Sequence, residues 1–219
     1  MENQVHNWVI IGESGCGKTE VSLYLAREKK KGTSKRVTLV DMDQTKGMFR
    51  SRDFADTLQR EGIHVVSGTH FMDMPVIPHG VEKLLLDEES INILDVGGNE
   101  TGAVALGQFS ELINMPGTKI LYLMNPYRNF SGTTENIKML MDGIQSAGRA
   151  ERVTVFCNPN LGAGTTEQDV WKGYARLGEL LAPLGLKAEG LVIPCWVDAA
   201  AFSRQNIPVW AITPCIQYP

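Results

Sequence analysis

The sequence predicts an α/β fold in three layers, in which a doubly wound, mostly parallel sheet carries helices on both faces. Apolar, β-branched runs alternate with amphipathic segments along the chain, which is typical of such folds. Strand-like runs such as Ile120–Met124 are apolar throughout, as expected for parallel strands that are covered on both sides. The 219 residues are expected to form a single domain, 1–219.

The first helix is the best marked of the predicted elements. Val21, Tyr24 and Leu25 have helical spacing, and Gly32 follows a basic last turn, so we expect a helix over Glu20–Lys31. The expected strands are Val5–Ile11, Arg36–Val40, His64–Ser67, Ile91–Asp95, Lys119–Met124, Arg152–Cys157 and Gly190–Ile193, with a further candidate at Val209–Ile212. The other expected helices are Gly47–Glu61, Val81–Glu88, Thr101–Asn114, Thr134–Ala147 and Thr166–Leu181.

A glycine-rich turn links the first strand to this helix and fits the pattern G-x-x-x-x-G-K-[ST] at every fixed position. Glycines allow the backbone to fold around a polyphosphate, with amide N–H groups and the positive end of the helix dipole directed inward. Lys18 is expected to reach the β and γ phosphates, and the Thr19 hydroxyl to ligate Mg²⁺. The nucleotide-binding residues predicted here are Glu13, Ser14, Gly15, Cys16, Gly17, Lys18, Thr19 and Glu20.

Two further segments place carboxylates at strand ends. Asp41 and Asp43 leave the second strand and can point toward the same crevice, where they could hold a Mg²⁺-bound water or orient an attacking water; a solvated turn is the alternative. Another apolar strand ends in Asp95, which is followed by Gly97 and Gly98. Asp95 would accept from a Mg²⁺-bound water, and the Gly98 backbone could approach the γ phosphate. The predicted metal residues are thus Thr19, Asp41 and Asp95, and the predicted catalytic residues are Lys18 and Asp43.

The order of these three motifs resembles the MinD, ParA and CobQ/CobB-like proteins, which belong to the SIMIBI class of P-loop NTPases. The resemblance runs from Val5 to about Leu186. It implies ATP and Mg²⁺ as cofactors, and it implies that Asn158, at the end of a later strand, contacts the adenine base; an ordinary turn residue is the alternative. The GTP-selective sequence Asn-Lys-x-Asp is absent, which favours ATP.

The chain departs from this family pattern at two places. MinD and ParA proteins carry a second lysine early in the loop that reaches the partner's nucleotide across a dimer, and here that position is Glu13. The segment 207–219 has no basic amphipathic helix of the kind that anchors MinD to a membrane. A homodimer is therefore left open, and no membrane anchor is expected.

Composition excludes several other classes of protein. Hydrophobic residues make up 43% and charged residues 21%, which is ordinary for a globular protein, and no apolar run approaches the ~18 residues of a membrane span. The polar start Met1–Asn7 reaches the first strand too soon for a secretory signal, so we expect a cytoplasmic protein with its four cysteines as free thiols. The net charge of −4 makes direct nucleic-acid binding unlikely.

These features lead to one main functional hypothesis and two alternatives. The first is a Mg²⁺-dependent ATPase that acts as a molecular switch or loads an unknown protein partner, with slow turnover because no arginine finger is obvious in cis. Arg50 or Arg52 could contact phosphate or a partner, although a solvated basic helix start is favoured. The alternatives are an ATP-dependent ligase or kinase resembling dethiobiotin synthetase, with a substrate pocket built from Met72–Gly80 and Gly98–Gly107, and a nucleotide-binding module without hydrolysis.

Overall fold

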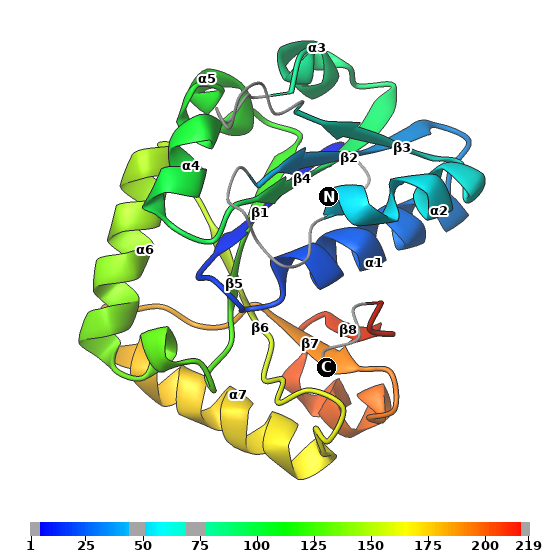
Figure 1. Cartoon of the computed structure of the whole chain (residues 1–219). Coiled ribbons are helices and arrows are strands. Elements are labelled where there is room, and N and C mark those ends of the chain that lie inside the picture. Colours follow the sequence, from blue (N-terminus) through cyan, green and yellow to red (C-terminus); the bar gives the residue numbers. More distant parts are fainter. Residues whose placement is uncertain (1–4, 44–50, 69–77, 216–219) are drawn as a thin grey trace.

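Strands from the whole length of the chain join one parallel sheet in the computed structural model, which describes residues 5–43, 51–68 and 78–215 (Figure 1). The sheet has eight strands in the order β3-β2-β4-β1-β5-β6-β7-β8, and each neighbouring pair is parallel. The predicted α/β fold is therefore confirmed, including the last candidate strand. The strands are β1 Asn7–Gly12, β2 Arg36–Met42, β3 Ile63–Ser67, β4 Ser90–Val96, β5 Thr118–Met124, β6 Thr154–Cys157, β7 Gly190–Pro194 and β8 Val209–Ile212.

Helices cover both faces of the sheet (Figure 1). On one face lie α1 (Lys18–Lys31) and α2 (Ala55–Arg60). On the other face lie α3 (Val81–Leu86), α4 (Glu100–Gly107), α5 (Ser110–Ile113), α6 (Thr134–Gly148) and α7 (Glu167–Leu181). None of the described helices is both long enough and apolar enough to cross a membrane.

The position of β1 in the centre of the sheet explains why its residues 8–11 are all apolar. Trp8 and Ile10 belong to the core cluster beneath α1 and α2, whereas Val9 and Ile11 belong to the cluster beneath the other five helices. All four side chains are at most 1% exposed. Because successive residues of a strand point to opposite faces, a strand covered on both sides has no polar face, and this is the basis of the sequence pattern.

The structure corrects several predicted boundaries. The helix expected over Thr101–Asn114 is divided into α4 and α5. The end of α4 lies close to α6, where a Cβ on Gly107 would be 2.6 Å from the Ala147 carbonyl oxygen. The chain then turns at residues 108–109, where the Phe109 N–H donates to the Leu106 carbonyl. Of the predicted helix Gly47–Glu61, residues 47–50 lie outside the described residues, and the described part is a 3₁₀ turn followed by α2.

Strands β2 and β4 run further than predicted. Both continue by one or two residues because they pair with each other to the end, with Asp41 beside Asp95 and Met42 beside Val96. The two aspartates are thus held inside the sheet edge rather than in a solvated turn. This pairing decides the geometry of the site described below.

Helix α7 begins with a capping box, which generates a stability prediction. The Asp169 N–H donates to Thr166 Oγ1 at 3.2 Å, and the Thr166 N–H donates to Asp169 Oδ2 at 2.9 Å. We expect Thr166→Ala to lower the free energy of unfolding by about 1 kcal/mol in urea denaturation, because the Asp169 N–H at the helix start loses the hydroxyl that accepts from it. Thr166→Ser keeps the hydroxyl and is expected to stay close to wild type; equal stability of all three proteins would show that the box contributes nothing.

Candidate functional site

The glycine-rich loop Gly12–Thr19 leaves the carboxyl end of β1 and opens α1. Gly12 and Gly17 have φ values of +141° and +97°, which side chains with a Cβ rarely adopt. A Cβ on Gly12 would also collide with the Leu123 carbonyl oxygen, and one on Gly17 would lie 2.5 Å from the Asn158 amide nitrogen. The fixed glycines of the motif are therefore required by close approach of β5 and β6 as well as by the turn itself.

The loop ends in an uncapped helix N-terminus. The N-cap of α1 is Gly17, which has no side chain to accept from the first amide groups of this 14-residue helix. Lys18, 8% exposed, folds back over the loop and donates from Nζ to the Glu13 carbonyl oxygen at 2.8 Å. Amide dipoles and an ammonium group thus converge on one small region, which is the arrangement that binds phosphate in proteins.

Glu13 stands where MinD and ParA proteins carry their second loop lysine, and its side chain reaches the segment that follows β5. Its carboxylate accepts from Ser131 Oγ at 2.7 Å, and the side chain is only 3% exposed. Burial raises the pKa of Glu13, while the hydrogen bonds from Ser131 and the Asn125 backbone, together with the charges of Lys18 and Arg128, act in the opposite direction. Glu13 therefore ties the loop to the segment that follows β5.

Asp41 and Asp95 lie beside each other under the loop, on the neighbouring strands β2 and β4. Each is 1% exposed, and Oδ2 of Asp95 has no hydrogen-bond partner among the described residues. Burial, and next the charge of Asp41, raise the pKa of Asp95 to about 7, against the opposing effects of Lys18 and a hydrogen bond with Thr19. Two carboxylates buried side by side on neighbouring strands lower the stability of the folded protein unless a cation binds between them.

These residues fit a Mg²⁺ ion. The orphaned Asp95 oxygen, the Thr19 hydroxyl and the Asp41 carboxylate are the hard oxygen donors that Mg²⁺ prefers. Within the described part of the chain no three His, Cys, Asp or Glu side chains are grouped to hold a metal by themselves. A Mg²⁺ ion here would accordingly share its coordination with phosphate oxygens and water, as is usual for this ion.

Asp43 and the glycine pair 97–98 approach the loop from the same edge. The Asp43 N–H donates to Asp41 Oδ1 at 3.0 Å, and Asp43 Oδ1 lies 3.2 Å from the position of a Cβ on Gly97. A Cβ on Gly98 would be 2.7 Å from Ser14 Cα and 2.8 Å from Lys18 Nζ. The backbone of residues 97–98 thus closes the region where a γ phosphate would lie, and only glycine allows this approach.

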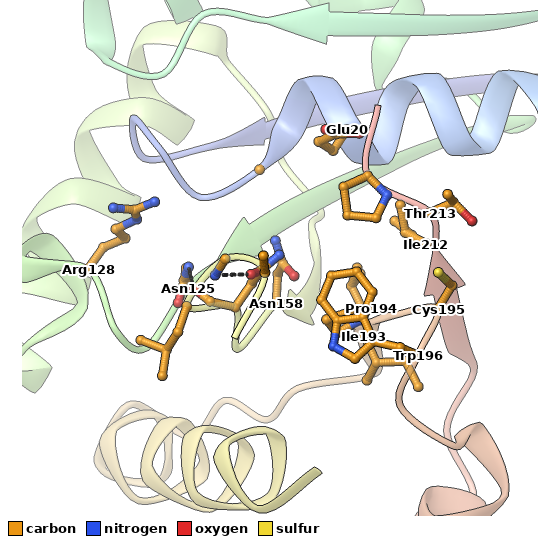
Figure 2. Close-up of a pocket in the computed structure, with 17 residues that line it drawn as sticks. Glu20, Asn125, Arg128, Asn158, Ile193, Pro194, Cys195, Trp196, Ile212 and Thr213 are labelled. Atoms are coloured by element: carbon orange, nitrogen blue, oxygen red, sulfur yellow. Dashed lines mark hydrogen bonds between the residues drawn. The ribbon is translucent and has the colours of Figure 1, made fainter. Parts of the chain in front are cut away.

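A cavity of about 710 Å³ lies next to Gly17, at the carboxyl ends of β5 to β8 (Figure 2). Its wall includes the apolar groups of Leu161, Ile193 and Trp196, and the Trp196 indole is fixed by donating to the Thr165 carbonyl at 2.9 Å. The Asn158 amide donates to the Cys16 carbonyl at 2.8 Å. Asn158 therefore braces the loop from the cavity side.

Glu20 and Cys16, both predicted to bind nucleotide, have structural contacts of their own. The Glu20 carboxylate lines the cavity and accepts from the Cys215 N–H at 3.0 Å, so it holds the chain end after β8 against α1. The Cys16 side chain is fully buried, and burial raises the pKa of its thiol to about 11. The backbone of Cys16 faces the site, but its sulfur is an inert part of the core.

The structure brings most of the predicted site residues together at one edge of the sheet. They are Glu13, Ser14, Gly15, Cys16, Gly17, Lys18, Thr19, Asp41, Asp43, Asp95 and Gly98, with Asn158 on the cavity side of the loop and Glu20 one turn into α1. Arg50 and residues 72–77 of the expected substrate loop lie outside the described residues, as does the side chain of Arg52.

Sequence reasoning missed Arg128 as a site residue. Its Nε donates to the Gly15 carbonyl at 3.0 Å, so a cation does reach the loop in cis. The position of Arg128 in the sequence is a signal, because it follows shortly after Met124, the last residue of β5. Strand β5 is the direct neighbour of β1, with Leu123 beside Gly12, so a residue just beyond β5 lies near the loop. The strand order needed for this step is not contained in the motif itself.

No protein-family model matches the chain, and no curated protein matches it by sequence. Solved structures do resemble it. The cell division protein FtsY of Thermotoga maritima is 16% identical with a TM-score of 0.53, over 84% of this chain and 60% of that one. FtsY of Mycoplasma mycoides is 12% identical with a TM-score of 0.52, over 84% and 58%. The signal recognition particle receptor FtsY of Elizabethkingia anophelis in complex with GDP is 15% identical with a TM-score of 0.45, over 70% and 48%.

At these identities the likeness shows the fold alone, and this chain spans less than two thirds of the length of each of those structures. The parallel α/β fold is thus shared with the FtsY structures of Thermotoga maritima and Mycoplasma mycoides. The narrower likeness to MinD and ParA is not reproduced among these neighbours.

The buried Asp95 generates a prediction about pH. Burial raises its folded-state pKa to about 7 from the ordinary value of 3.8, so between about pH 4 and 7 the unfolded chain releases a proton that the folded protein keeps. The free energy of unfolding of the ligand-free protein should therefore fall as pH rises through this window and then level off. Asp95→Asn is expected to remove this dependence and to be more stable than wild type by about 1–3 kcal/mol at about pH 8 in urea denaturation.

Asp142→Asn is the matched control for Asp95→Asn, because this surface carboxylate pairs with Lys138 of its own helix. It should follow the wild-type pH profile. A wild-type profile that rises between about pH 4 and 7, or an Asp95→Asn variant less stable than wild type at about pH 8, would contradict the buried-carboxyl account.

Proposed function

We propose that the protein binds and slowly hydrolyses ATP with Mg²⁺ and acts as a molecular switch or partner-loading factor of the MinD/ParA type. The observation that carries this proposal is the buried Asp41–Asp95 pair beneath a glycine loop whose single lysine lies across from it. A lysine, an uncapped helix start and an unsatisfied carboxylate oxygen are complementary to a phosphate chain and its metal ion.

Each chemical role falls to a residue at this edge of the sheet. The loop amides and Lys18 bind the β and γ phosphates, once Lys18 Nζ exchanges the Glu13 carbonyl for phosphate oxygen. Thr19, Asp41 and Asp95 hold the Mg²⁺ shell, and the ion supplies neutralisation of charge on the phosphates. Asp43 orients the attacking water, since it stands beside Gly97 at the γ-phosphate side of the loop.

The cavity beside Gly17 is proposed as the nucleoside site. It has apolar walls, a fixed indole at Trp196, and the polar groups of Asn158 and Asn125. Because the Asn158 amide nitrogen is bonded to the Cys16 carbonyl, its Oδ1 is directed as an acceptor. Adenine offers a donor at its exocyclic amine where guanine offers an acceptor, so this orientation favours ATP.

The contact of Gly98 with the loop supports a switch. A γ phosphate needs the space that Gly98 shares with Ser14 and Lys18, so residues 97–98 must shift when triphosphate binds. These residues lead directly into α4, through its N-cap Asn99. Nucleotide state would therefore be transmitted to the α4 surface, where a protein partner or a second copy of the chain could detect it.

Lys18→Ala tests the phosphate site. We expect this variant to lose at least about tenfold in affinity for ATP–Mg²⁺ by calorimetry, because a charge-assisted contact to phosphate is removed. Lys138→Ala, which removes an exposed lysine on α6, should bind as wild type does. GTP is titrated in parallel and should bind more weakly than ATP. Equal ATP affinity of wild type and Lys18→Ala would contradict the loop assignment.

Asp43→Asn tests the hydrolytic role separately. ADP production should fall about 10–100-fold while ATP affinity changes by less than about threefold, because a water-orienting group acts mainly in the transition state. An unchanged rate would contradict the role of Asp43. ADP release only in the presence of a small carboxylate metabolite would indicate the ligase alternative, and tight ATP binding without ADP would indicate the non-hydrolysing module.

A further inference from the structure

The segment after β5 brings a guanidinium group to the rim of the phosphate loop. Arg128 lies beyond Asn125 and Pro126, and its Nε donates to the Gly15 carbonyl at 3.0 Å. Nε and Cζ lie 3.6 and 3.8 Å from the position of a Cβ on Gly15. No described residue accepts from Nη1 or Nη2 of Arg128, and the side chain is exposed on the wall of the cavity. The N–H groups on Nη1 and Nη2 therefore remain able to donate to a ligand in the cavity beside the loop.

Hydrogen bonds to neighbouring segments hold the turn at residues 125–128, so the position of Arg128 is defined. The Asn125 side chain accepts from the Tyr127 N–H at 3.0 Å and donates to the Asn160 carbonyl at 2.9 Å. Tyr127 in turn donates from its hydroxyl to the Asp169 carbonyl of α7 at 2.6 Å. A fork on a rigid turn loses little conformational entropy when it binds an anion.

The segment after β5 also stabilises the charged form of Glu13, the acidic residue of the loop. Ser131, three residues after Arg128, donates to the Glu13 carboxylate, and the charge of Arg128 lowers the pKa of this carboxyl group against the effect of burial. A carboxylate in a phosphate loop opposes the binding of a polyanion unless a second cation compensates for it. Lys18 is one cation of this loop, and Arg128 stands at its opposite rim as a second.

We propose that Arg128 binds the polyphosphate of the nucleotide in cis, with Nη1 and Nη2 on phosphate oxygens while Nε stays on the Gly15 carbonyl. Figure 2 shows Arg128 at one end of the cavity and Trp196 at the other, with Asn158 between them, which is the order of phosphate and base in a nucleotide. This assignment rests on the proposed nucleotide site. Arg128 thus supplies, from the same chain, a positive charge beside the loop, in which Glu13 stands at the position of the second lysine of MinD and ParA proteins.

The test is calorimetric titration of ATP and ADP, each with Mg²⁺, into wild type, Arg128→Ala, Arg128→Gln and Arg128→Lys. Arg128→Ala and Arg128→Gln are expected to lose about 10–50-fold in affinity for both nucleotides, whereas Arg128→Lys recovers part of the loss because it keeps the charge without the fork. The loss should shrink as salt is raised from about 50 to 500 mM, since a charge contact is screened.

Glutamine separates phosphate binding from loop bracing, because its amide can still donate to the Gly15 carbonyl. Wild-type affinity in Arg128→Gln, or a loss that does not change with salt, would assign Arg128 to bracing alone and overturn the proposal. Thermal unfolding of the ligand-free variants shows whether each is folded at the titration temperature. If wild type binds nucleotide, Lys18→Ala does not, and Arg128→Ala binds as wild type does, this inference is overturned and the proposed function stays intact. If wild type does not bind nucleotide, both are overturned.

Discussion

The close approach of the phosphate-loop backbone to the ends of β5 and β6 is the constraint on which the rest of the site depends. Gly12 lies against the Leu123 carbonyl, and the Asn158 amide holds the Cys16 carbonyl at 2.8 Å. These two contacts fix the loop against β5 and β6. The aspartates Asp41 and Asp95 lie at the ends of β2 and β4, on the other side of β1. The cavity proposed for the nucleoside lies beside Asn158, which also lines it.

The site holds more acidic than basic side chains. Glu13, Asp41 and Asp95 are buried acids, whereas Lys18 is the buried cation among them, and Arg128 stands at the exposed rim. The protein compensates by hydrogen-bonding Glu13 to Ser131 and by a raised pKa at Asp95. Such local destabilisation is characteristic of functional sites, and binding of the proposed phosphate–metal complex would relieve it.

Much of the fold could be predicted because its causes are local. Strands covered on both faces are largely apolar, and the loop motif carries its own backbone requirements at Gly12 and Gly17. Contacts that depend on strand order could not be predicted in the same way. Asp41 and Asp95 are neighbours only because β4 pairs with β2, and Arg128 reaches the loop only because β5 lies beside β1. The close approach of Gly107 to α6 and the hydrogen bond from the Cys215 N–H to the Glu20 carboxylate likewise join segments far apart in the sequence.

The most direct test of this account is a crystal structure with a non-hydrolysable ATP analogue and Mg²⁺. The account predicts that Lys18 Nζ leaves the Glu13 carbonyl for phosphate oxygen and that the ion lies beside Thr19 and the Asp41–Asp95 pair. It also predicts that Gly98 moves away from Ser14 and that the adenine enters the cavity between Asn158 and Trp196. An analogue bound elsewhere, with Lys18 still on the Glu13 carbonyl and Asp95 still without a cation, would contradict it.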